Sequence, residues 1–346
     1  MSVLLVGGAG FLGLHLVEQF SRHCPDMKLT VFDVRPIPDQ ISSYFSFSPS
    51  EIDFFKGDLT SEESIREAIT KTKCNVIVHS ASPMHGLAQE IYEKVNVEGT
   101  NTLLRVAKEM EVPNFVYTSS AGVIFNGQDV YNADESWPYP QVHMDGYNET
   151  KATAETAVMK ANAPGFRTVC LRPAGIFGPG DRQLVPGLRA TARNGQSKYQ
   201  LGDNNNLFDW TYVGNVADAH VLATQKLLYG TVEEIEAIAG ETFFITNDAP
   251  TYFWTLARTV WKQDGVVDKS YIKLSRPVAI GLGYVSEAVS KMLGKEPGIT
   301  PFRVKVVCAN RYHDITKAKT LLGYKPAVDL EQGIKYTLEW MNESST

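Results

Sequence analysis

The sequence predicts an α/β fold in which a doubly wound parallel sheet is followed by a smaller, mixed C-terminal lobe. Short β-branched or aromatic runs alternate with helical patterns through the first half of the chain, as expected for buried parallel strands. A glycine-rich turn joins the first of these runs to the first helical pattern. After Pro173 the regular alternation of strand and helix patterns is interrupted by loops rich in Gly, Pro and Asn.

Six runs in the first half have strand length; in chain order they are SVLLVG, KLTVFDV, IDFFKGD, NVIVHSA, NFVYTSS and RTVCLRP. Helical periodicity separates them and predicts helices over residues 12–23, 61–71, 88–110 and 147–161. The second of these opens with Thr60, Ser61 and two glutamates, which is typical of a capped helix start. Such alternation implies right-handed crossovers between parallel strands.

The second half shows helical patterns near residues 183–194, 214–229, 251–263 and 277–294. They are separated by loops such as FGPGDRQ and LGDNNN. We place a soft boundary at residue 173, so that residues 1–173 form the larger lobe and residues 174–346 the smaller one. Some of the later chain is expected to return to the first lobe.

Composition narrows the class of protein. A chain of 346 residues supports two lobes, and a net charge of −6 without any basic run argues against a nucleic-acid partner. The seven histidines show no metal-ligand spacing, so we expect no metal site. Four scattered cysteines without a Cys-x-x-Cys spacing are typical of buried thiols in a reducing compartment: Cys24, Cys74, Cys170 and Cys308.

Targeting signals are weak in this sequence. The opening MSVLLVGGAG passes directly into a strand and a glycine turn, so we expect no signal peptide. No stretch approaches the roughly 20 apolar residues that span a membrane. Residues 278–294 either pack in the C-terminal lobe or insert shallowly into a membrane surface. Basic residues that would favour insertion lie around them: Lys269, Lys273, Arg276, Lys291 and Lys295.

The first turn has the spacing of a phosphate-binding loop. Gly7, Gly10 and Gly13 form Gly-x-x-Gly-x-x-Gly between the first strand and the first helix. Glycines let the backbone approach a pyrophosphate, and the helix N-terminus offers free N–H groups. The alternative is that the three glycines only permit close packing of helix on strand.

Two acids follow later strands. Asp33 ends the second strand, where a carboxylate binds the adenosine ribose and favours NAD. Arg35 could instead pair with a 2′-phosphate, so NADP remains possible, and either residue could be a plain surface charge. Asp58 follows the third strand and either accepts from the adenine amino group or is an acid at a helix start.

Tyr147 and Lys151 form a Tyr-x-x-x-Lys pattern on a predicted helix. Residues four apart share a helix face, so the phenol and the ammonium are expected to enter one cleft. There the cation would lower the pKa of the phenol towards neutrality, as a base in hydride chemistry requires. An ordinary surface Tyr–Lys pair is the alternative.

Ser120 lies at the end of the fifth predicted strand, where it could hydrogen-bond a substrate oxygen beside Tyr147. Otherwise it is a turn former. Asn96 lies inside a predicted helix, which an amide enters reluctantly. It could hold a water relay, orient Lys151, or simply pack between helices.

Together with His79-Ser80-Ala81 and Leu171-Arg172-Pro173, these motifs occur in the order of an extended short-chain dehydrogenase with a Rossmann fold. The chain resembles the 3β-hydroxysteroid dehydrogenase family, and within it the fungal branch that acts on sterol 4α-carboxylates. Segments carrying this resemblance include SASPMHG, YTSSAGVIFNGQD, NADESWP, LRPAGIFGPGDRQLVPGLR and NNNLFDWTYVGNVADAH. One departure is Val123-Ile124-Phe125, where many sugar-nucleotide relatives have Val-Tyr-Gly. It makes a sugar-nucleotide substrate less expected.

The resemblance implies a role for each matching residue. Tyr147 would be the base, Lys151 would hold the nicotinamide ribose, and Ser120 would orient the hydroxyl. The implied activity is NAD(P)-dependent oxidation of the 3β-hydroxyl of a 4α-carboxysterol with decarboxylation, in ergosterol biosynthesis. The implied dinucleotide site, in residues 1–173 and just beyond, comprises Gly7, Gly10, Phe11, Leu12, Gly13, Asp33, Arg35, Asp58, Leu59, Ala81, Ser82, Tyr147, Lys151, Pro173 and Gly175.

A substrate carboxylate needs a cationic or hydrogen-bonding partner, and Arg182 and His85 are the candidates. Arg182 could equally pair with Asp181, and His85 could simply line a loop. The resemblance also implies peripheral attachment to the cytosolic face of the endoplasmic reticulum membrane. A homodimer and contacts with other enzymes of sterol C4-demethylation are expected on the same ground.

Three alternatives stay open. A sugar-nucleotide epimerase or dehydratase on this scaffold would need a diphosphate-binding arginine, for which Arg172, Arg182 and Arg189 are available. A dehydrogenase for another hydrophobic alcohol is the second. A non-catalytic NAD(H)-sensing protein is the third, although such proteins typically lose the Tyr/Lys pair that this chain retains.

Overall fold

The computed structural model describes residues 1–39, 41–294 and 298–343. Its centre is a seven-stranded sheet in the order β12-β7-β5-β4-β1-β2-β3. Every pairing in this sheet is parallel, which confirms the doubly wound α/β prediction. The strands are β1 (Ser2–Val6), β2 (Lys28–Asp33), β3 (Asp53–Lys56), β4 (Val76–His79), β5 (Asn114–Thr118), β7 (Arg167–Pro173) and β12 (Glu241–Ile245).

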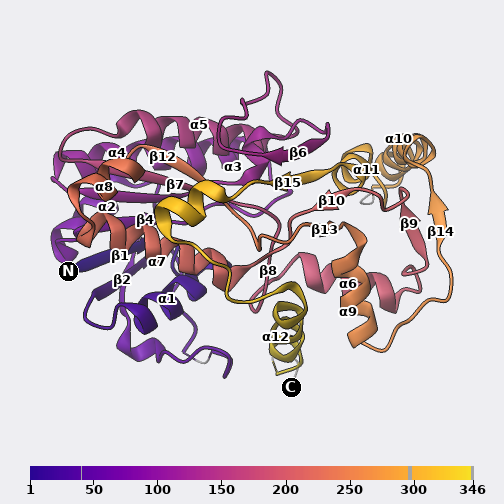
Figure 1. Ribbon diagram of the computed structural model, residues 1–346, viewed down its shortest axis with the longest axis horizontal. Helices are drawn as coiled ribbons and strands as arrows, with labels where there is room; N and C mark the ends of the chain where they lie inside the picture. Colours follow the sequence, from indigo (N-terminus) through magenta and orange to yellow (C-terminus); the bar gives the residue numbers. More distant parts are fainter. Residues whose placement is uncertain (40, 295–297, 344–346) are drawn as a thin grey trace.

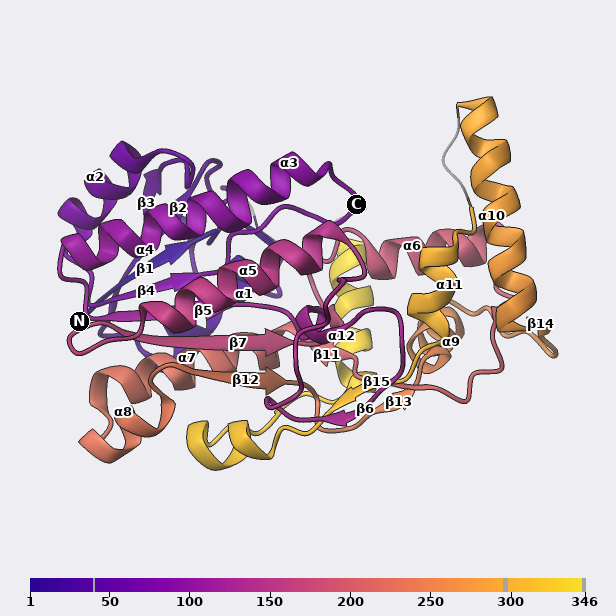
Figure 2. The same cartoon turned by 90° about the horizontal axis from the view of Figure 1, so that it is seen from above.

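Helices cover both faces of the sheet because its strands are apolar on both sides (Figure 1). On one face, α1 (Phe11–His23) packs along α7 (Val213–Tyr229). On the other lie α2 (Glu62–Thr72), α4 (Thr100–Glu109) and α5 (Gly146–Ala161), as the turned view in Figure 2 shows. The expected helix over 88–110 is interrupted: α3 (Gln89–Tyr92) passes through a π-helical segment, η2 (Glu93–Gly99), into α4.

The two halves of the chain exchange strands. β12 pairs with β7 in the large sheet, although it follows residue 173. In return β6 (Val130–Ala133) joins β15 (Arg311–His313), β10 (Leu207–Phe208) and β13 (Thr251–Tyr252) in a small sheet of mixed direction. The smaller mixed lobe is thereby confirmed, while a division at residue 173 stays a prediction.

The remaining elements surround the small sheet. Two further strand pairs are β8 (Ile176–Phe177) with β11 (Thr211–Tyr212), and β9 (Tyr199–Leu201) with β14 (Ile272–Leu274). The helices are α6 (Leu184–Arg193), α8 (Val232–Ile238), α9 (Trp254–Gln263), α10 (Arg276–Leu293), α11 (Pro301–Cys308) and α12 (Leu330–Glu343). The helix expected over 251–263 starts later than predicted, because its first two residues form β13. Short 3-10 or π segments are η1 (Pro49–Glu51), η3 (Ala121–Ile124) and η4 (Ala318–Leu322).

Buried histidines should make this fold sensitive to acid. Burial lowers the pKa of His15 and His220 to about 4 and that of His79 to about 3. Between pH 6.5 and 4 the unfolded chain therefore binds protons that the folded chain does not, and stability falls as the pH falls. Each histidine should remove roughly 2 kcal/mol of unfolding free energy between pH 7.5 and pH 5. Asp218, whose pKa burial raises to about 6, opposes this loss only in part.

Urea unfolding at pH 7.5 and pH 5 measures this effect. His220→Gln is the matched variant. It should reduce the number of protons taken up on unfolding by about one, whatever its effect on the unfolding free energy at pH 7.5. Equal unfolding free energies of the unmodified protein at the two pH values would contradict the prediction.

Candidate active site

The carboxyl ends of four neighbouring strands meet at one edge of the large sheet. Gly7 follows β1, Ala81 lies just beyond β4, Ser120 lies just beyond β5, and Pro173 ends β7. Open parallel sheets bind their ligands outside this edge. The structure thus brings predicted cofactor and substrate residues together from four separate parts of the chain.

The turn between β1 and α1 has no room for side chains. A Cβ atom on Gly13 would lie 2.2 Å from the carbonyl oxygen of Gly7, and one on Gly7 would lie 2.6 Å from the backbone nitrogen of Ala81. Gly7 also has a φ of +88°, a conformation that favours glycine. No side chain caps α1, which begins at Phe11 after Gly10. Its first N–H groups therefore remain available to an anion, and the turn fits the pyrophosphate of a dinucleotide.

Asp33 is held over this turn. Its carboxylate accepts hydrogen bonds from the backbone nitrogens of Ala9, at 3.1 Å, and Arg35, at 3.2 Å. The Arg35 side chain is exposed beside it. Asp58 is also exposed, and its Oδ1 accepts from both the backbone nitrogen and the hydroxyl of Thr60. Asp58 thus forms a turn before α2, while its second oxygen makes no hydrogen bond within the described residues.

The other predicted cofactor residues lie around the same edge. Leu59 is buried, and its side chain leaves no room for a Cβ on Gly99, at 2.9 Å. A Cβ on Gly175 would lie 2.6 Å from the ring of Phe208. The segment that follows β7 is therefore packed against the small sheet, and the predicted cleft lies along this edge of the large sheet.

Both side chains of the Tyr-x-x-x-Lys pattern lie on α5 and reach this edge. Asp145 caps the helix by accepting the backbone N–H of Asn148 at 2.7 Å. The Lys151 ammonium donates to the carbonyl of Thr118 at the end of β5 and lies 4.3 Å from the Tyr117 ring centre. The structure thus brings the Lys151 ammonium to the end of β5, and a common cleft for the phenol and the ammonium stays a prediction.

Ser120 is brought next to the first turn of α5. Its Oγ accepts the backbone N–H of Gly122 at 3.0 Å and caps η3. A Cβ on Gly122 would lie 2.1 Å from the side-chain oxygen of Asn148. Because Gly122 allows this close approach, Ser120 is held beside the helix that carries Tyr147.

Burial favours the neutral forms of both groups. It lowers the pKa of Lys151 to about 7, against the opposing effect of Glu155. It raises the pKa of Tyr147 to about 12, although the neighbouring Ser82 hydroxyl lowers it. Burial, opposed by the Ser82 hydroxyl, dominates the pKa of Tyr147, and the lowering of the phenol pKa by Lys151 stays a prediction.

Asn96 is fully buried within η2. Its Oδ1 accepts the Ser82 hydroxyl at 2.9 Å, and its Nδ2 donates to the Thr150 hydroxyl at 3.1 Å. Within the described part of the chain no hydrogen bond joins Asn96 to Lys151. Asn96 therefore positions Ser82, which in turn lies beside the Tyr147 phenol.

His85 lies directly on the ring of Tyr147, with ring centres 3.9 Å apart. Tyr92 fixes the loop that carries it, donating to the carbonyl of Met84 and accepting the N–H of Leu87. Desolvation against the phenol lowers the pKa of the His85 imidazole. Of the two substrate candidates, His85 therefore contacts the predicted base.

Arg182 is placed elsewhere in the cleft. Its side chain is exposed. A Cβ atom on Gly180, two residues earlier, would lie 3.3 Å from the Phe11 ring at the glycine turn. Asp181 is not its ion partner, because that carboxylate accepts the backbone N–H groups of residues 183–185 at the start of α6. The chain at Gly180, two residues before Arg182, therefore lies next to the glycine turn.

The other two arginines considered for a diphosphate are already paired. Arg172 is buried and bonds Glu155 through Nε and Nη2, at distances from 2.6 to 3.1 Å. Arg189 bonds Asp264 at 2.7 Å. Neither guanidinium is free to hold a sugar nucleotide without breaking its ion pair.

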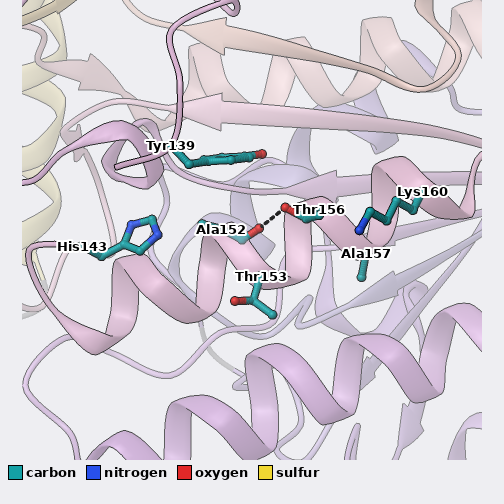
Figure 3. Close-up of a pocket in the computed structure, with 7 residues that line it drawn as sticks. All are labelled: Tyr139, His143, Ala152, Thr153, Thr156, Ala157 and Lys160. Carbon is teal, nitrogen blue, oxygen red and sulfur yellow. Dashed lines mark hydrogen bonds between the residues drawn. The ribbon is translucent and has the colours of Figure 1, made fainter. Parts of the chain in front are cut away.

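A surface depression beside α5 is separate from this cleft (Figure 3). Thr156 donates to the carbonyl of Ala152 along one wall. None of the catalytic candidates lines it; its residues are Tyr139, His143, Ala152, Thr153, Thr156, Ala157 and Lys160. It therefore plays no part in the arrangement described above.

Solved structures with the same fold bind nucleotide sugars or NAD. dTDP-glucose 4,6-dehydratase of Bacillus anthracis, solved with NAD, is 20% identical, with a TM-score of 0.72 over 100% of this chain and 97% of that one. UDP-glucose 4-epimerase of Thermotoga maritima is 21% identical, with a TM-score of 0.72 over 100% of both chains. At these identities they establish the fold alone.

Sequence relatives are much closer. Sterol-4-alpha-carboxylate 3-dehydrogenase, decarboxylating, from Candida albicans is 74% identical over 99% of this chain and 98% of its own. Its Saccharomyces cerevisiae counterpart is 64% identical over the same shares. The human protein of that name is 35% identical over 97% and 87%. The model of the 3-beta hydroxysteroid dehydrogenase/isomerase family matches residues 4–276, and the chain belongs to this family.

Proposed function

We propose that the protein uses NAD to oxidise the 3β-hydroxyl of a 4α-carboxysterol, with loss of the carboxylate as CO2. The proposal rests above all on 74% identity, over nearly the whole chain, to an enzyme of that name. The structure supports it, since Lys151 bonds the carbonyl of Thr118 two residues before Ser120, and Tyr147 lies on the same helix as Lys151. The glycine turn suits a dinucleotide.

The residues present fit NAD. Gly7, Gly10 and Gly13 and the uncapped start of α1 would hold its pyrophosphate, and Asp33 its adenosine ribose. When bound, NAD supplies the hydride acceptor and a positively charged ring that favours the Tyr147 phenolate. Lys151 would donate to the nicotinamide ribose from its place below the phenol.

The chemistry of the chain's own groups then follows. Tyr147 takes the proton of the 3-hydroxyl while Ser120 holds its oxygen. Oxidation leaves a ketone adjacent to the carbon that carries the carboxylate. When that C–C bond breaks, its electron pair moves to the ketone oxygen, CO2 leaves, and the enolate takes a proton at C4. Ser120 and the protonated Tyr147 would stabilise the enolate oxygen.

Incubation of the purified protein with a 4α-carboxysterol and NAD or NADP tests the proposal. We expect reduced nucleotide and CO2 to form in equal amounts, faster with NAD. Oxidation of a UDP-sugar, or no reduced nucleotide with any carboxysterol, would refute it.

We also propose peripheral attachment to a membrane through α10. No helix within the described residues is long and apolar enough to cross a membrane. α10 projects from the body of the protein (Figure 2) and buries only Ala279 and Gly283, which face α11. Exposed apolar side chains follow one another at helical spacing along it: Val278, Leu282, Val285, Val289 and Met292. Lys269, Lys273 and Lys291 flank this face, and Lys295 lies outside the described residues.

Sedimentation with vesicles of phosphatidylcholine and phosphatidylserine measures this attachment. Leu282→Glu with Val285→Glu should lower vesicle binding at least about tenfold, because two charges would enter the apolar layer. Tyr229→Glu, on an exposed part of α7, is the control and should not change binding. Undiminished binding of the double variant would contradict the proposal. The cytosolic face of the endoplasmic reticulum, a homodimer and contacts with other C4-demethylation enzymes stay predictions.

A further inference from the structure

Within the described part of the chain, Arg311 has no carboxylate at ion-pair distance. It begins β15, and its guanidinium carbon lies 4.4 Å from the ring centre of Phe125 and 4.5 Å from that of Phe208. Its Nε is buried without a hydrogen bond, and its Nη2 reaches only the carbonyl of Val306, at 3.4 Å. Within residues 1–39, 41–294 and 298–343 it forms no ion pair.

Its neighbours belong to the catalytic cleft. Phe125 ends the short η3 segment that Ser120 caps. Phe208 fills the space that a Cβ on Gly175 would occupy, at 2.6 Å. Arg311 therefore lies between the hydroxyl-orienting serine and the end of β7 that borders the nicotinamide side.

The positive charge of Arg311 also acts on a neighbour of Tyr147. The positive charge of Arg311 lowers the pKa of His85, whose ring lies 3.9 Å from that of Tyr147. Asp145, the cap of α5, acts on Arg311 in the opposite direction to burial. Burial lowers the pKa of Arg311 to about 10, so the side chain remains charged at neutral pH.

Burying a charged group without a counter-ion costs free energy, and an anion bound beside the guanidinium would offset this cost. Two other buried or half-buried arginines have a carboxylate partner, Glu155 for Arg172 and Asp264 for Arg189. The half-buried Arg258 has none within the described residues, but it donates to the side-chain oxygen of Gln200. The two rings flanking Arg311 fix the plane of its guanidinium, which suits a planar carboxylate. Because no described carboxylate lies within ion-pair distance of this guanidinium, the missing anion must come from the ligand.

We propose that Arg311 binds the carboxylate of the substrate. The inference rests on the proposed function, in which this carboxylate is attached to the carbon next to the reacting one. A residue that recognises it must therefore lie on the side of the site where Ser120 lies, and Arg311 lies against the ring of Phe125, which directly follows the segment that Ser120 caps. Gly180, two residues before Arg182, lies beside Phe11 at the glycine turn, and the His85 ring lies against that of Tyr147.

The test compares a carboxylated with a neutral ligand. In Arg311→Gln, kcat/KM for the 4α-carboxysterol should fall about 100-fold, the loss expected for a charge-assisted hydrogen-bonded pair. The inhibition constant of the neutral 3-ketosterol product should change less than about threefold, since this ligand has no carboxylate for Arg311 to bind. Arg311→Lys, which keeps the charge without the planar fork, should show an intermediate loss for the carboxysterol alone.

Arg258→Gln is the matched control. Arg258, on α9, also has a buried Nε without a hydrogen bond among the described residues. Its guanidinium lies over the ring of Tyr271, away from the cleft. Neither kcat/KM for the 4α-carboxysterol nor the inhibition constant of the 3-ketosterol should change in this variant. If Arg311→Gln does not fold, Arg311→Lys carries the same comparison.

Two outcomes overturn the inference while leaving the proposed function intact: unchanged kcat/KM for the carboxysterol, or equal losses for the carboxylated and neutral ligands. Failure of the unmodified enzyme to form reduced nucleotide and CO2 from the carboxysterol refutes the proposed function itself.

Discussion

Tyr147→Phe is expected to lower kcat about 1,000-fold, since proton transfer by a positioned group contributes within this range. The phenylalanine keeps the ring under His85 but removes the oxygen that takes the substrate proton. Cofactor affinity should change little, because the pyrophosphate site at Gly7 and α1 is untouched. The expected loss is therefore confined to the chemical step.

Single-turnover kinetics with the carboxysterol and NAD measure this loss, with fluorescence of bound NADH as the test of cofactor affinity. Tyr229→Phe is the control, since Tyr229 is exposed at the end of α7. A fall in kcat of less than about tenfold would show that another group takes the proton. Candidates would then be sought among the neighbours of the phenol, beginning with His85.

Glu155→Gln is expected to lower the free energy of unfolding by about 3–5 kcal/mol, because it leaves a buried guanidinium without its counter-charge. Glu155 is fully buried on α5, one turn beyond Lys151, and Arg172 is buried on β7. Tyr139 donates to the same carboxylate, yet a neutral hydroxyl cannot replace the lost charge. Removal of both charged groups should therefore cost less than removal of one.

Urea unfolding of Glu155→Gln, and of the double variant Glu155→Leu with Arg172→Leu, tests this order of stability. The control is Glu62→Gln in the exposed network with Arg66 and Arg105, which should lower the free energy of unfolding far less than Glu155→Gln. If Glu155→Gln is no less stable than the control variant, the buried pair does not hold α5 on the sheet.

Local patterns predicted most of the first half. The six apolar runs became β1 to β5 and β7, and the helix starting at Ser61 is capped by that side chain. These features depend on residues a few positions apart, whose periodicity is present in the sequence itself. The interruption of α3 and α4 by η2 was not predicted, because the buried amide of Asn96 bonds groups outside its own helix.

Several functional contacts carried no local signal. Asn96 and Thr150 are 54 positions apart, and the contact between Arg311 and Phe125 joins β15 to the segment after β5. A lone arginine or tyrosine in such a segment resembles many others in the chain. Only folding showed that Tyr92 fixes the His85 loop and that Arg311 lies unpaired in the cleft.

By itself, the sequence determined the parallel α/β architecture, the glycine turn and the common face of Tyr147 and Lys151, since strand and helix periodicities set these over short distances. Only the tertiary structure decided how these groups are charged and which partners they have. Desolvation depends on everything packed around a group, so burial raises the pKa of Tyr147 although its neighbours in the sequence do not show it. The surroundings of Arg311, whose Nε has no hydrogen bond within the described residues, likewise come from segments distant in the sequence.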